Sequence, residues 1–272
     1  MSQRSLVGKV VLVTGAAGGL GAALCRAVSA AGAHVVAMDV DEAALARLLT
    51  GLPAGTLAVG GRADGDISSV EACQRAVAQA LAHFGGLDVL VNNAGISHRS
   101  LLQDTDPAVI RRVVEVNFFG AMQMTHAALP HLLARRGVVA VISSVAGYAP
   151  LVGRTGYCAA KHALHGFFDT LRAEVEDRGV QVTLVCPSFM ATGIGGAALG
   201  GTGASATSPR ITTGGESDPA DVAQRILQAL AQGRALLLPD RTSRLAWWAR
   251  KLAPGFYARS MKRRVGAEFQ QP

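Results

Sequence analysis

Aromatic residues and charges are both scarce in this chain. Phe, Trp and Tyr make up 5% of the 272 residues, charged residues 17% and hydrophobic residues 50%. Such a composition excludes an intrinsically disordered chain and predicts a mainly aliphatic core. No apolar run approaches the roughly 20 residues that span a bilayer, and the N-terminus lacks the pattern of a signal peptide. We therefore expect a cytoplasmic protein, and its length fits one large domain.

Cysteine is also rare, and its positions argue against a metal centre. The four cysteines lie far apart and show no metal-ligand spacing: Cys25, Cys73, Cys158 and Cys186. They are typical of reduced thiols in a cytoplasmic protein. We expect no bound metal.

Acidic residues are missing from one segment. The formal net charge is +7, but residues 241–264 hold eight basic residues and no acidic one, whereas the residues before them are close to neutral. The basicity therefore belongs to a C-terminal extension, residues 241–272, and not to the domain of residues 1–240. We expect no nucleic-acid partner.

Seven short apolar segments recur along the domain, and most are nearly continuous in Val, Leu and Ile. This is typical of strands buried on both faces of a parallel sheet. Helical patterns separate them, and two of these open with an aspartate N-cap and a proline, at Asp106-Pro107 and Asp218-Pro219. The alternation predicts an α/β fold, a doubly wound parallel seven-stranded sheet of Rossmann type. The predicted strands are 9–14, 34–40, 56–60, 87–92, 137–143, 181–187 and 235–239.

Residues 193–217 interrupt this alternation. The segment is rich in glycine and other small residues and almost free of charge. A structureless stretch of that length in a compact domain is typical of a mobile lid or of disorder. Because it follows the sixth predicted strand, at the carboxyl edge where such sheets bind ligands, we favour a mobile lid loop.

A glycine-rich turn follows the first predicted strand (TGAAGGLG, residues 14–21). Gly15 permits the tight turn, Gly19 lets the backbone approach a pyrophosphate, and Gly21 allows close packing of helix on strand. The helix that includes Leu20 offers free N–H groups to phosphates. A glycine turn alone can be purely structural, but the order of strand, turn and helix predicts a dinucleotide site.

The second predicted strand ends near Asp39. A carboxylate at this point accepts hydrogen bonds from the ribose hydroxyls of the adenosine half and repels a 2′-phosphate. Neither Val40 nor its neighbours supply an arginine to bind that phosphate. The alternative is that Asp39 or Asp41 only caps the next helix. We predict NAD over NADP as the cofactor.

Tyr157 and Lys161 lie four residues apart, on one face of a predicted helix. Alone, the pair is compatible with a half-buried tyrosine and a lysine whose stem covers apolar surface. Ser144, at the end of the fifth predicted strand, and Asn117, on an apolar helix stripe, add polar groups nearby. Lowering the tyrosine pKa by three units takes roughly 4 kcal/mol, which an ammonium about 4 Å away supplies.

With these motifs the chain resembles the short-chain dehydrogenase/reductase family, in its compact single-domain branch. One departure is Pro187-Ser188, where the family usually has Pro-Gly, and it leaves the contact with the nicotinamide end of the cofactor open. The matching motifs run in order along the chain: residues 14–21, Asp66-Ile67, residues 92–95, Asn117, Ser144, Tyr157, Lys161, and Pro187 with Thr192.

The resemblance implies a role for each matching residue. Tyr157 is the general acid/base, Ser144 orients the substrate oxygen, and Lys161 lowers the tyrosine pKa and binds the nicotinamide ribose. Asn117 holds a water of the proton relay. Cofactor contacts are implied for Asp66 and Ile67 at the adenine, Asn93 and Gly95 at the nearby ribose, and Pro187 and Thr192 at the nicotinamide.

The basic extension has three interpretations. Leu245, Trp248 and Leu252 recur at helical spacing, and Pro254 follows them. The segment can lie on an anionic membrane surface, bind nucleic acid, or pack on its own or a partner subunit with a solvated basic face. Interleaved stacking residues are missing, which disfavours nucleic acid, and packing on protein is the interpretation that we favour.

We expect an enzyme that transfers a hydride between NAD(H) and a secondary alcohol or ketone. The family resemblance implies a homodimer or homotetramer. The alternatives are a regulatory dinucleotide-binding protein without turnover, which the complete catalytic set disfavours, and a membrane-surface dehydrogenase of lipophilic alcohols. Tyr148, Phe189 and Met190 near the expected pocket are compatible with a lipophilic substrate but do not select one.

Overall fold

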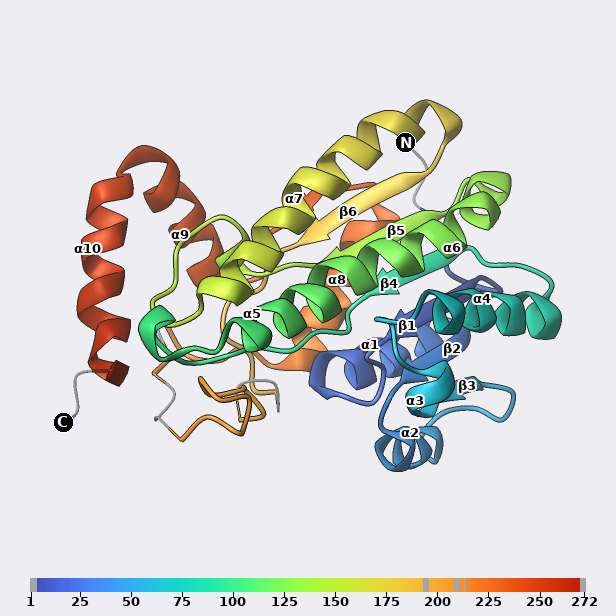
Figure 1. The fold of residues 1–272 in the computed structure, drawn as a ribbon. Helices are drawn as coiled ribbons and strands as arrows, with labels where there is room; N and C mark the ends of the chain where they lie inside the picture. Colours follow the sequence, from blue (N-terminus) through green and yellow to red (C-terminus); the bar gives the residue numbers. More distant parts are fainter. Residues whose placement is uncertain (1–3, 193–195, 208–210, 213, 270–272) are drawn as a thin grey trace.

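Strands and helices alternate along the chain until the C-terminal extension (Figure 1). The computed structural model describes residues 4–192, 196–207, 211–212 and 214–269. The strands are β1 (Val10–Thr14), β2 (His34–Asp39), β3 (Leu57–Gly60), β4 (Val89–Asn92), β5 (Val138–Ile142), β6 (Gln181–Val185) and β7 (Leu236–Leu237). The α-helices are α1 (Gly19–Ala30), α2 (Glu42–Leu49), α3 (Gly61–Asp64), α4 (Val70–Phe84), α5 (Pro107–Val114), α6 (Gly120–Arg135), α7 (Thr155–Val175), α8 (Pro219–Ala231), α9 (Arg241–Leu252) and α10 (Pro254–Val265).

The strands form one seven-stranded sheet in the order β3-β2-β1-β4-β5-β6-β7. Every pairing is parallel, with Val10 opposite His34 on one side of β1 and Val11 opposite Val89 on the other. The predicted Rossmann-type sheet is therefore confirmed. Most strands are one to three residues shorter than their apolar segments, because those segments continue into the adjoining turns.

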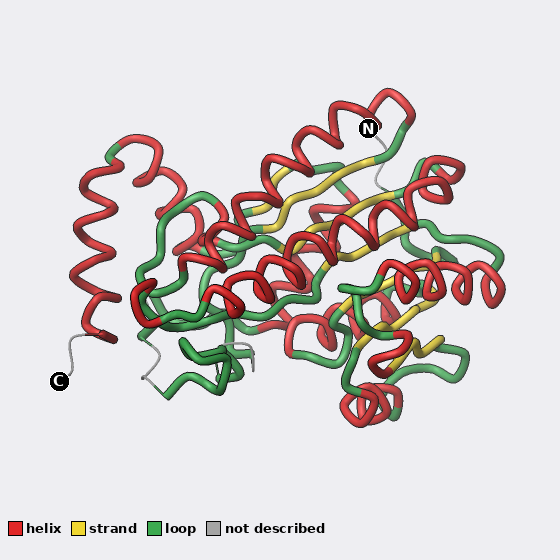
Figure 2. Tube along the Cα trace, in the orientation of Figure 1, coloured by secondary structure: helices red, strands yellow, loops and turns green. Residues whose placement is uncertain are grey.

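Two helical layers cover the sheet, and each buries its own aliphatic cluster (Figures 1 and 2). One cluster joins the strands to α4, α6 and α7, and includes Leu12 and Phe168. The other joins them to α1, α2 and α8, and includes Val13 and Ile226. Consecutive residues of β1 thus face opposite layers, as the side-chain alternation of a strand requires.

Both predicted N-caps are confirmed. The Asp106 carboxylate accepts a hydrogen bond from Ala108 N at 2.8 Å before α5, and Asp218 accepts one from Ala220 N at 2.8 Å before α8. Asn117 is buried together with Val113, Ala121 and Met124 of the expected apolar stripe. The helix that carries this stripe is not continuous, because a π-helical turn, η2 (Glu115–Phe119), which includes Asn117, joins α5 to α6.

The strand order reverses at β1, because β2 follows on one side and β4 on the other. The connections that leave these strands diverge, and the crevice between them is the usual ligand site of such sheets. A cleft of about 1320 Å³ opens here and extends to the extension.

The extension folds into two helices, α9 and α10, which pack against each other at one end of the sheet (Figure 1). α9 also contacts the 3-10 turn η3 (Val145–Gly147), and Trp247 meets the Tyr148 ring edge-on with centroids 4.8 Å apart. Among the helices described, none has the length and apolar character needed to cross a membrane.

The predicted lid is described only in part, since residues 193–195, 208–210 and 213 lie outside the described residues. Residues 198–199 pack on the segment that follows β4. Leu199 N donates to Ser97 O at 2.9 Å, Arg99 N donates to Leu199 O at 2.7 Å, and Ala198 is buried. The mobility of this segment remains a prediction.

Candidate active site

The glycine turn after β1 is packed too closely for side chains. Gly15 has a φ of +62°, and a Cβ there would lie 2.7 Å from the Cα of Ala94. A Cβ on Gly19 would lie 2.5 Å from Cγ2 of Thr192, and one on Gly21 would collide with the carbonyl oxygen of Gly15. Backbone from both sides of the sheet therefore meets at this turn, and the first residues of α1 line the cleft.

Asn93 and Thr14 hold the turn in place. The Thr14 hydroxyl accepts hydrogen bonds from Asn93 N at 3.0 Å and Ala94 N at 3.1 Å. Asn93 Nδ2 in turn donates to the carbonyls of Thr14 and Gly15, both at 3.0 Å. The amide nitrogen of Asn93 therefore braces the cofactor turn, although the residue also lines the cleft.

Asp39 lies at the end of β2 and lines the cleft beside this turn. Its carboxylate accepts hydrogen bonds from Ala17 N at 2.9 Å and Asp41 N at 3.0 Å. Asp41 caps α2 through Ala44 N at 2.9 Å, so the capping alternative applies to Asp41. The structure also brings Arg62, which the sequence analysis did not consider, to the same cleft from the neighbouring strand edge.

Asp66 and Ile67 line the cleft on the side of α4. Asp66 Oδ1 accepts hydrogen bonds from the backbone N of Ser68 at 2.9 Å and from its hydroxyl at 2.6 Å. Ile67 is buried against Gly120, where an added Cβ would lie 2.6 Å from Ile67 Cδ1. The site assigned to the adenine thus has one polar and one apolar wall.

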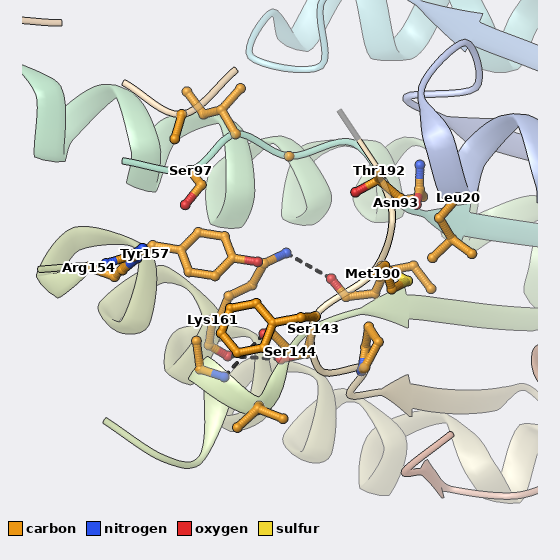
Figure 3. A pocket seen from close by; sticks show the side chains of 18 of the residues that line it. Leu20, Asn93, Ser97, Ser143, Ser144, Arg154, Tyr157, Lys161, Met190 and Thr192 are labelled. Carbon is orange, nitrogen blue, oxygen red and sulfur yellow. Dashed lines mark hydrogen bonds between the residues drawn. The ribbon is translucent and has the colours of Figure 1, made fainter. Parts of the chain in front are cut away.

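Tyr157, Lys161 and Ser144 meet at the other end of the cleft, away from Leu20, Asn93 and Thr192 (Figure 3). Tyr157 and Lys161 come from α7. Ser144 lies between the end of β5 and the start of η3. Lys161 Nζ donates to the Ile142 carbonyl at 2.8 Å and lies 5.6 Å from the centroid of the Tyr157 ring. Ser144 hydrogen bonds to the Tyr157 phenol.

The neighbouring serines have different surroundings. Ser143 is buried, and its hydroxyl lies 3.1 Å from Nε2 of His165 and 3.4 Å from the carbonyl of Lys161. Ser143 therefore holds α7 against β5. Only Ser144 reaches the phenol of Tyr157.

Burial dominates the titration of both catalytic candidates. It raises the pKa of Tyr157 to about 12, against the lowering effect of the Ser144 hydrogen bond. It lowers the pKa of Lys161 to about 8. The tyrosine shift has the opposite direction to the one expected from the lysine charge, because desolvation of the buried phenol is its largest cause and the Lys161 ammonium, bound to the Ile142 carbonyl, does not contribute to it.

Two buried oxygens have no hydrogen-bond partner among the described residues, Asn117 Oδ1 and Thr192 Oγ1. Thr192 lines the cleft, whereas Asn117 lies behind Gly95 and is not part of the described lining. Asn117 Nδ2 donates to Ile96 O at 2.7 Å and Val113 O at 2.8 Å, which fixes the amide. A Cβ on Gly95 would lie 2.6 Å from Asn117 Oδ1 and 3.7 Å from Lys161 Nζ. The unpaired acceptor and the ammonium therefore flank the same glycine.

Ser188, the departure from the family pattern, connects the cleft to the extension. Its hydroxyl donates to Asp240 Oδ1 at 2.7 Å, and its backbone N donates to Oδ2 at 3.0 Å. Asp240 is the N-cap of α9 and accepts a hydrogen bond from Ser243 N at 2.7 Å. Pro187, which precedes Ser188 in the chain, and Thr192, which follows it, line the cleft.

The extension forms a wall of the cleft that the sequence analysis did not predict. Its lining side chains are mostly apolar, from Leu245, Ala246, Ala249, Phe256, Tyr257 and Met261. Phe189 and Met190 line the cleft as expected. Tyr148 is outside the described lining, and its hydroxyl donates to Ser243 O at 2.7 Å, so it anchors α9 instead. Of the amphipathic stripe in the sequence, only Leu245 belongs to this wall, so the spacing did not indicate it.

A buried ion pair ties the chain's last described residues to the start of α7. Arg154 Nη1 lies 2.6 Å from Glu268 Oε2, and the Glu268 side chain is fully buried. Oε1 of the same carboxylate accepts a hydrogen bond from Ile211 N at 2.6 Å. Arg154 also lines the cleft three residues before Tyr157. Among the described residues, no cluster of side chains suits a metal ion.

Comparisons with known proteins agree with this geometry. The family model described as short chain dehydrogenase matches residues 9–199. Dehydrogenase/reductase SDR family member 7B of Bos taurus is 39% identical over 272 residues, which cover 95% of this chain and 82% of the relative. A dehydrogenase/reductase SDR family protein 7-like of Anopheles gambiae is 38% identical over 274 residues, covering 96% and 84%.

Solved structures resemble the whole fold. A short-chain dehydrogenase from Streptomyces avermitilis has a TM-score of 0.81 and 29% identity, with 97% of this chain and 99% of that chain covered. A short chain dehydrogenase/reductase from Burkholderia phymatum in complex with NAD has a TM-score of 0.78 and 27% identity, with 92% and 96% covered. The chain therefore belongs to the short-chain dehydrogenase/reductase family of oxidoreductases.

Proposed function

We propose that this oxidoreductase transfers a hydride between NAD(H) and a secondary alcohol or ketone, with Tyr157 as the general acid/base. The observation that carries the proposal is the meeting of Tyr157, Ser144 and Lys161 in the cleft that begins at the glycine turn. A phenol, a hydroxyl and an ammonium in one cleft suit the movement of a proton to or from a substrate oxygen.

The residues present fit a dinucleotide. Gly15, Gly19 and Gly21 have no room for side chains, α1 begins in the cleft, and the buried Thr192 hydroxyl that lines it has no partner among the described residues. The solved relative from Burkholderia phymatum is a complex with NAD. When bound, the nicotinamide ring supplies or accepts the hydride. Gly15, Gly19 and Leu20 would hold its pyrophosphate, and Thr192 the nicotinamide end.

Each residue at the catalytic end has a task that its contacts support. Tyr157 transfers the proton at the substrate oxygen, and Ser144, which hydrogen bonds to the phenol, positions that oxygen. The Lys161 ammonium donates a hydrogen bond to the Ile142 carbonyl, and its positive charge acts partly on the cleft. Asn117 Oδ1 accepts a hydrogen bond from a water beside Lys161, which continues the proton path to solvent.

The test is the substitution Tyr157→Phe. We expect kcat to fall by about 10²- to 10⁴-fold, since the acid/base group is lost, while the dissociation constant for NADH changes little. A panel of alcohols and ketones, followed by absorbance of the reduced cofactor, identifies the substrate class. Tyr148→Phe is the matched control, because that hydroxyl bonds to Ser243 outside the cleft. Equal activity of Tyr157→Phe and wild type would overturn the mechanism; dinucleotide binding without turnover in the wild type would favour the regulatory alternative.

The cofactor choice depends on Asp39. Its carboxylate is fixed by Ala17 and Asp41 at the cleft and repels a 2′-phosphate. We expect kcat/KM to favour NAD over NADP in the wild type, and Asp39→Ala to move the ratio towards NADP, helped by the nearby Arg62. Asp64→Ala is the control, because Asp64 pairs with Arg75 and is not part of the described cleft lining. A wild-type preference for NADP would refute the assignment.

We also propose a homodimer or homotetramer in the cytoplasm. The proposed interface includes α7 and the helical segment that bears Asn117, in whose turn η2 Phe119 is exposed. The four cysteines are free, which supports a reducing compartment. Light scattering coupled to size exclusion measures the assembly, and a monomer at micromolar concentration would refute it.

A further inference from the structure

The turn between α9 and α10 presents an uncharged, apolar tip to solvent. Residues 252–256 (LAPGF) are all exposed, and Leu252 and Phe256 are 78% and 63% exposed. Trp248, one turn earlier on the same face as Leu252, is 59% exposed. Together with Leu245, these are four of the nine large hydrophobic side chains that are exposed among the described residues. We call Trp248, together with residues 252–256, the hairpin tip.

Basic residues flank the hairpin tip on both sides. α9 and α10 carry all eight basic residues of the segment 241–264, and no acidic residue lies between them. In the part of the chain that the structure describes, no carboxylate forms an ion pair with any of the eight. Lys251 lies 4.5 Å over the ring of Trp247 instead. Within the described residues, the positive charge of this hairpin is thus left without an acidic partner.

The same two helices form the apolar wall of the cleft. Leu245 and Phe256 are both exposed and both line the cleft, so its rim is continuous with the hairpin tip. Figure 1 shows α10 at the periphery of the molecule, at the end opposite β3 and α2. A surface that received the hairpin tip would therefore meet the mouth of the cleft.

We propose that the α9–α10 hairpin docks on the surface of an anionic lipid bilayer. Exposed tryptophan, leucine and phenylalanine enter the interface between headgroups and acyl chains, and the surrounding lysines and arginines attract anionic headgroups. A second copy of the chain is disfavoured as the occupant, because it would bring the same positive charge to the contact. The apolar rim then receives lipophilic alcohols or ketones directly from the bilayer. This last step rests on the proposed function, whereas the docking does not.

Co-sedimentation with vesicles tests the docking on the full-length chain. We expect binding to phosphatidylcholine vesicles that contain phosphatidylglycerol, weaker binding at physiological than at low salt, and little binding to phosphatidylcholine alone. Arg250→Glu with Lys251→Glu should weaken binding by at least about 25-fold, roughly fivefold per positive charge removed. Trp248→Ser with Leu252→Ser should weaken it at least about tenfold at either salt concentration.

The matched control is Val70→Ser with Leu102→Ser, which removes two apolar side chains that are 46% and 62% exposed elsewhere. It should leave vesicle binding unchanged. Activity on a water-soluble alcohol should persist in the Trp248 and Leu252 variant, because neither residue is part of the described cleft lining. Failure of the wild type to bind anionic vesicles, or equal binding to neutral ones, would overturn the proposal. So would a change of oligomeric state in the tip variant with vesicle binding intact, since it would identify the tip as an interface between copies.

Discussion

At the scale of single residues, the proposed chemistry depends on how Tyr157 reaches its ionised form. Burial raises its pKa to about 12, and the hydrogen bond from Ser144 works in the opposite direction. Alcohol oxidation needs the phenolate to accept a proton, whereas ketone reduction needs the neutral phenol to donate one. The two reaction directions should therefore respond to pH in different ways.

We expect kcat/KM for oxidation to rise as the pH increases from neutrality. The reason is that the ionised fraction of Tyr157 increases as the pH approaches its raised pKa. Reduction should stay flat over the same range. Ser144→Ala removes the hydrogen bond that lowers the pKa, so its rising limb should move to higher pH. Ser143→Ala is the matched neighbour, because that hydroxyl faces His165. Oxidation that falls with rising pH would contradict this assignment.

Most of the candidate site could be predicted at this scale, since its signals are local. Tyr157 and Lys161 share a helix face. The glycines of the first turn pack closely against one another and against Ala94 and Thr192. The direction of the tyrosine pKa could not be predicted, because it depends on how completely the fold removes water from the phenol. The sequence shows the lysine but not the carbonyl of Ile142 that binds it.

At the scale of elements, contacts between distant segments hold the catalytic helix. Glu268, in the 3-10 turn η6 (Gly266–Phe269), pairs with Arg154 at the N-terminus of α7 and with Ile211. The ion pair joins residues 114 positions apart. A contact between residues so far apart leaves no pattern in the local sequence, so no role could be predicted for Arg154 and Glu268. Ser188 and Asp240 form a second link of this kind.

Glu268→Gln should destabilise the protein by about 3–5 kcal/mol, because it leaves the buried Arg154 guanidinium without a counter-charge. KM should rise more than kcat falls, since Arg154 lines the cleft while Tyr157 keeps its own contacts. Urea unfolding and steady-state kinetics measure the two effects. Asp64→Asn, in a half-exposed pair with Arg75, should cost less than about 1 kcal/mol. Equal losses in the two variants would contradict a special role for the buried pair.

At the scale of the whole molecule, the sheet was predictable and the extension was not. Continuous Val, Leu and Ile segments report burial on both faces, and this fixes a parallel sheet before any contact is known. The extension lacks such a constraint. The position of the extension over the cleft depends on Tyr148, Ser188 and Asp240. These residues lie outside α9, and their hydrogen bonds hold that helix in place.

The stability of the whole fold should fall in acid, in part because of His98. This side chain is fully buried, and burial, followed by the charge of Arg154, lowers its pKa from 6.5 to about 4. The unfolded chain therefore binds more protons between these pH values, so stability falls as pH decreases from about 6.5 to 4, by about 3 kcal/mol. Urea unfolding at pH 7 and pH 5 measures about 2 kcal/mol of this loss, which His98→Leu should reduce. His83→Leu, at an exposed position, is the control. An unchanged loss in His98→Leu would contradict the assignment.

Because η2 is a π-helical turn, the number of residues in the α5–α6 segment affects the proposed chemistry. Removing one residue from it would rotate everything that follows by about 100° relative to α5. The rotation would displace both Gly120, which packs on Ile67, and the Asn117 oxygen beside Gly95. The packing of the core and the proposed proton path thus depend on the same number of residues in this segment. Sequence divergence in this stretch has to proceed by exchange of side chains, because any shortening would damage both at once.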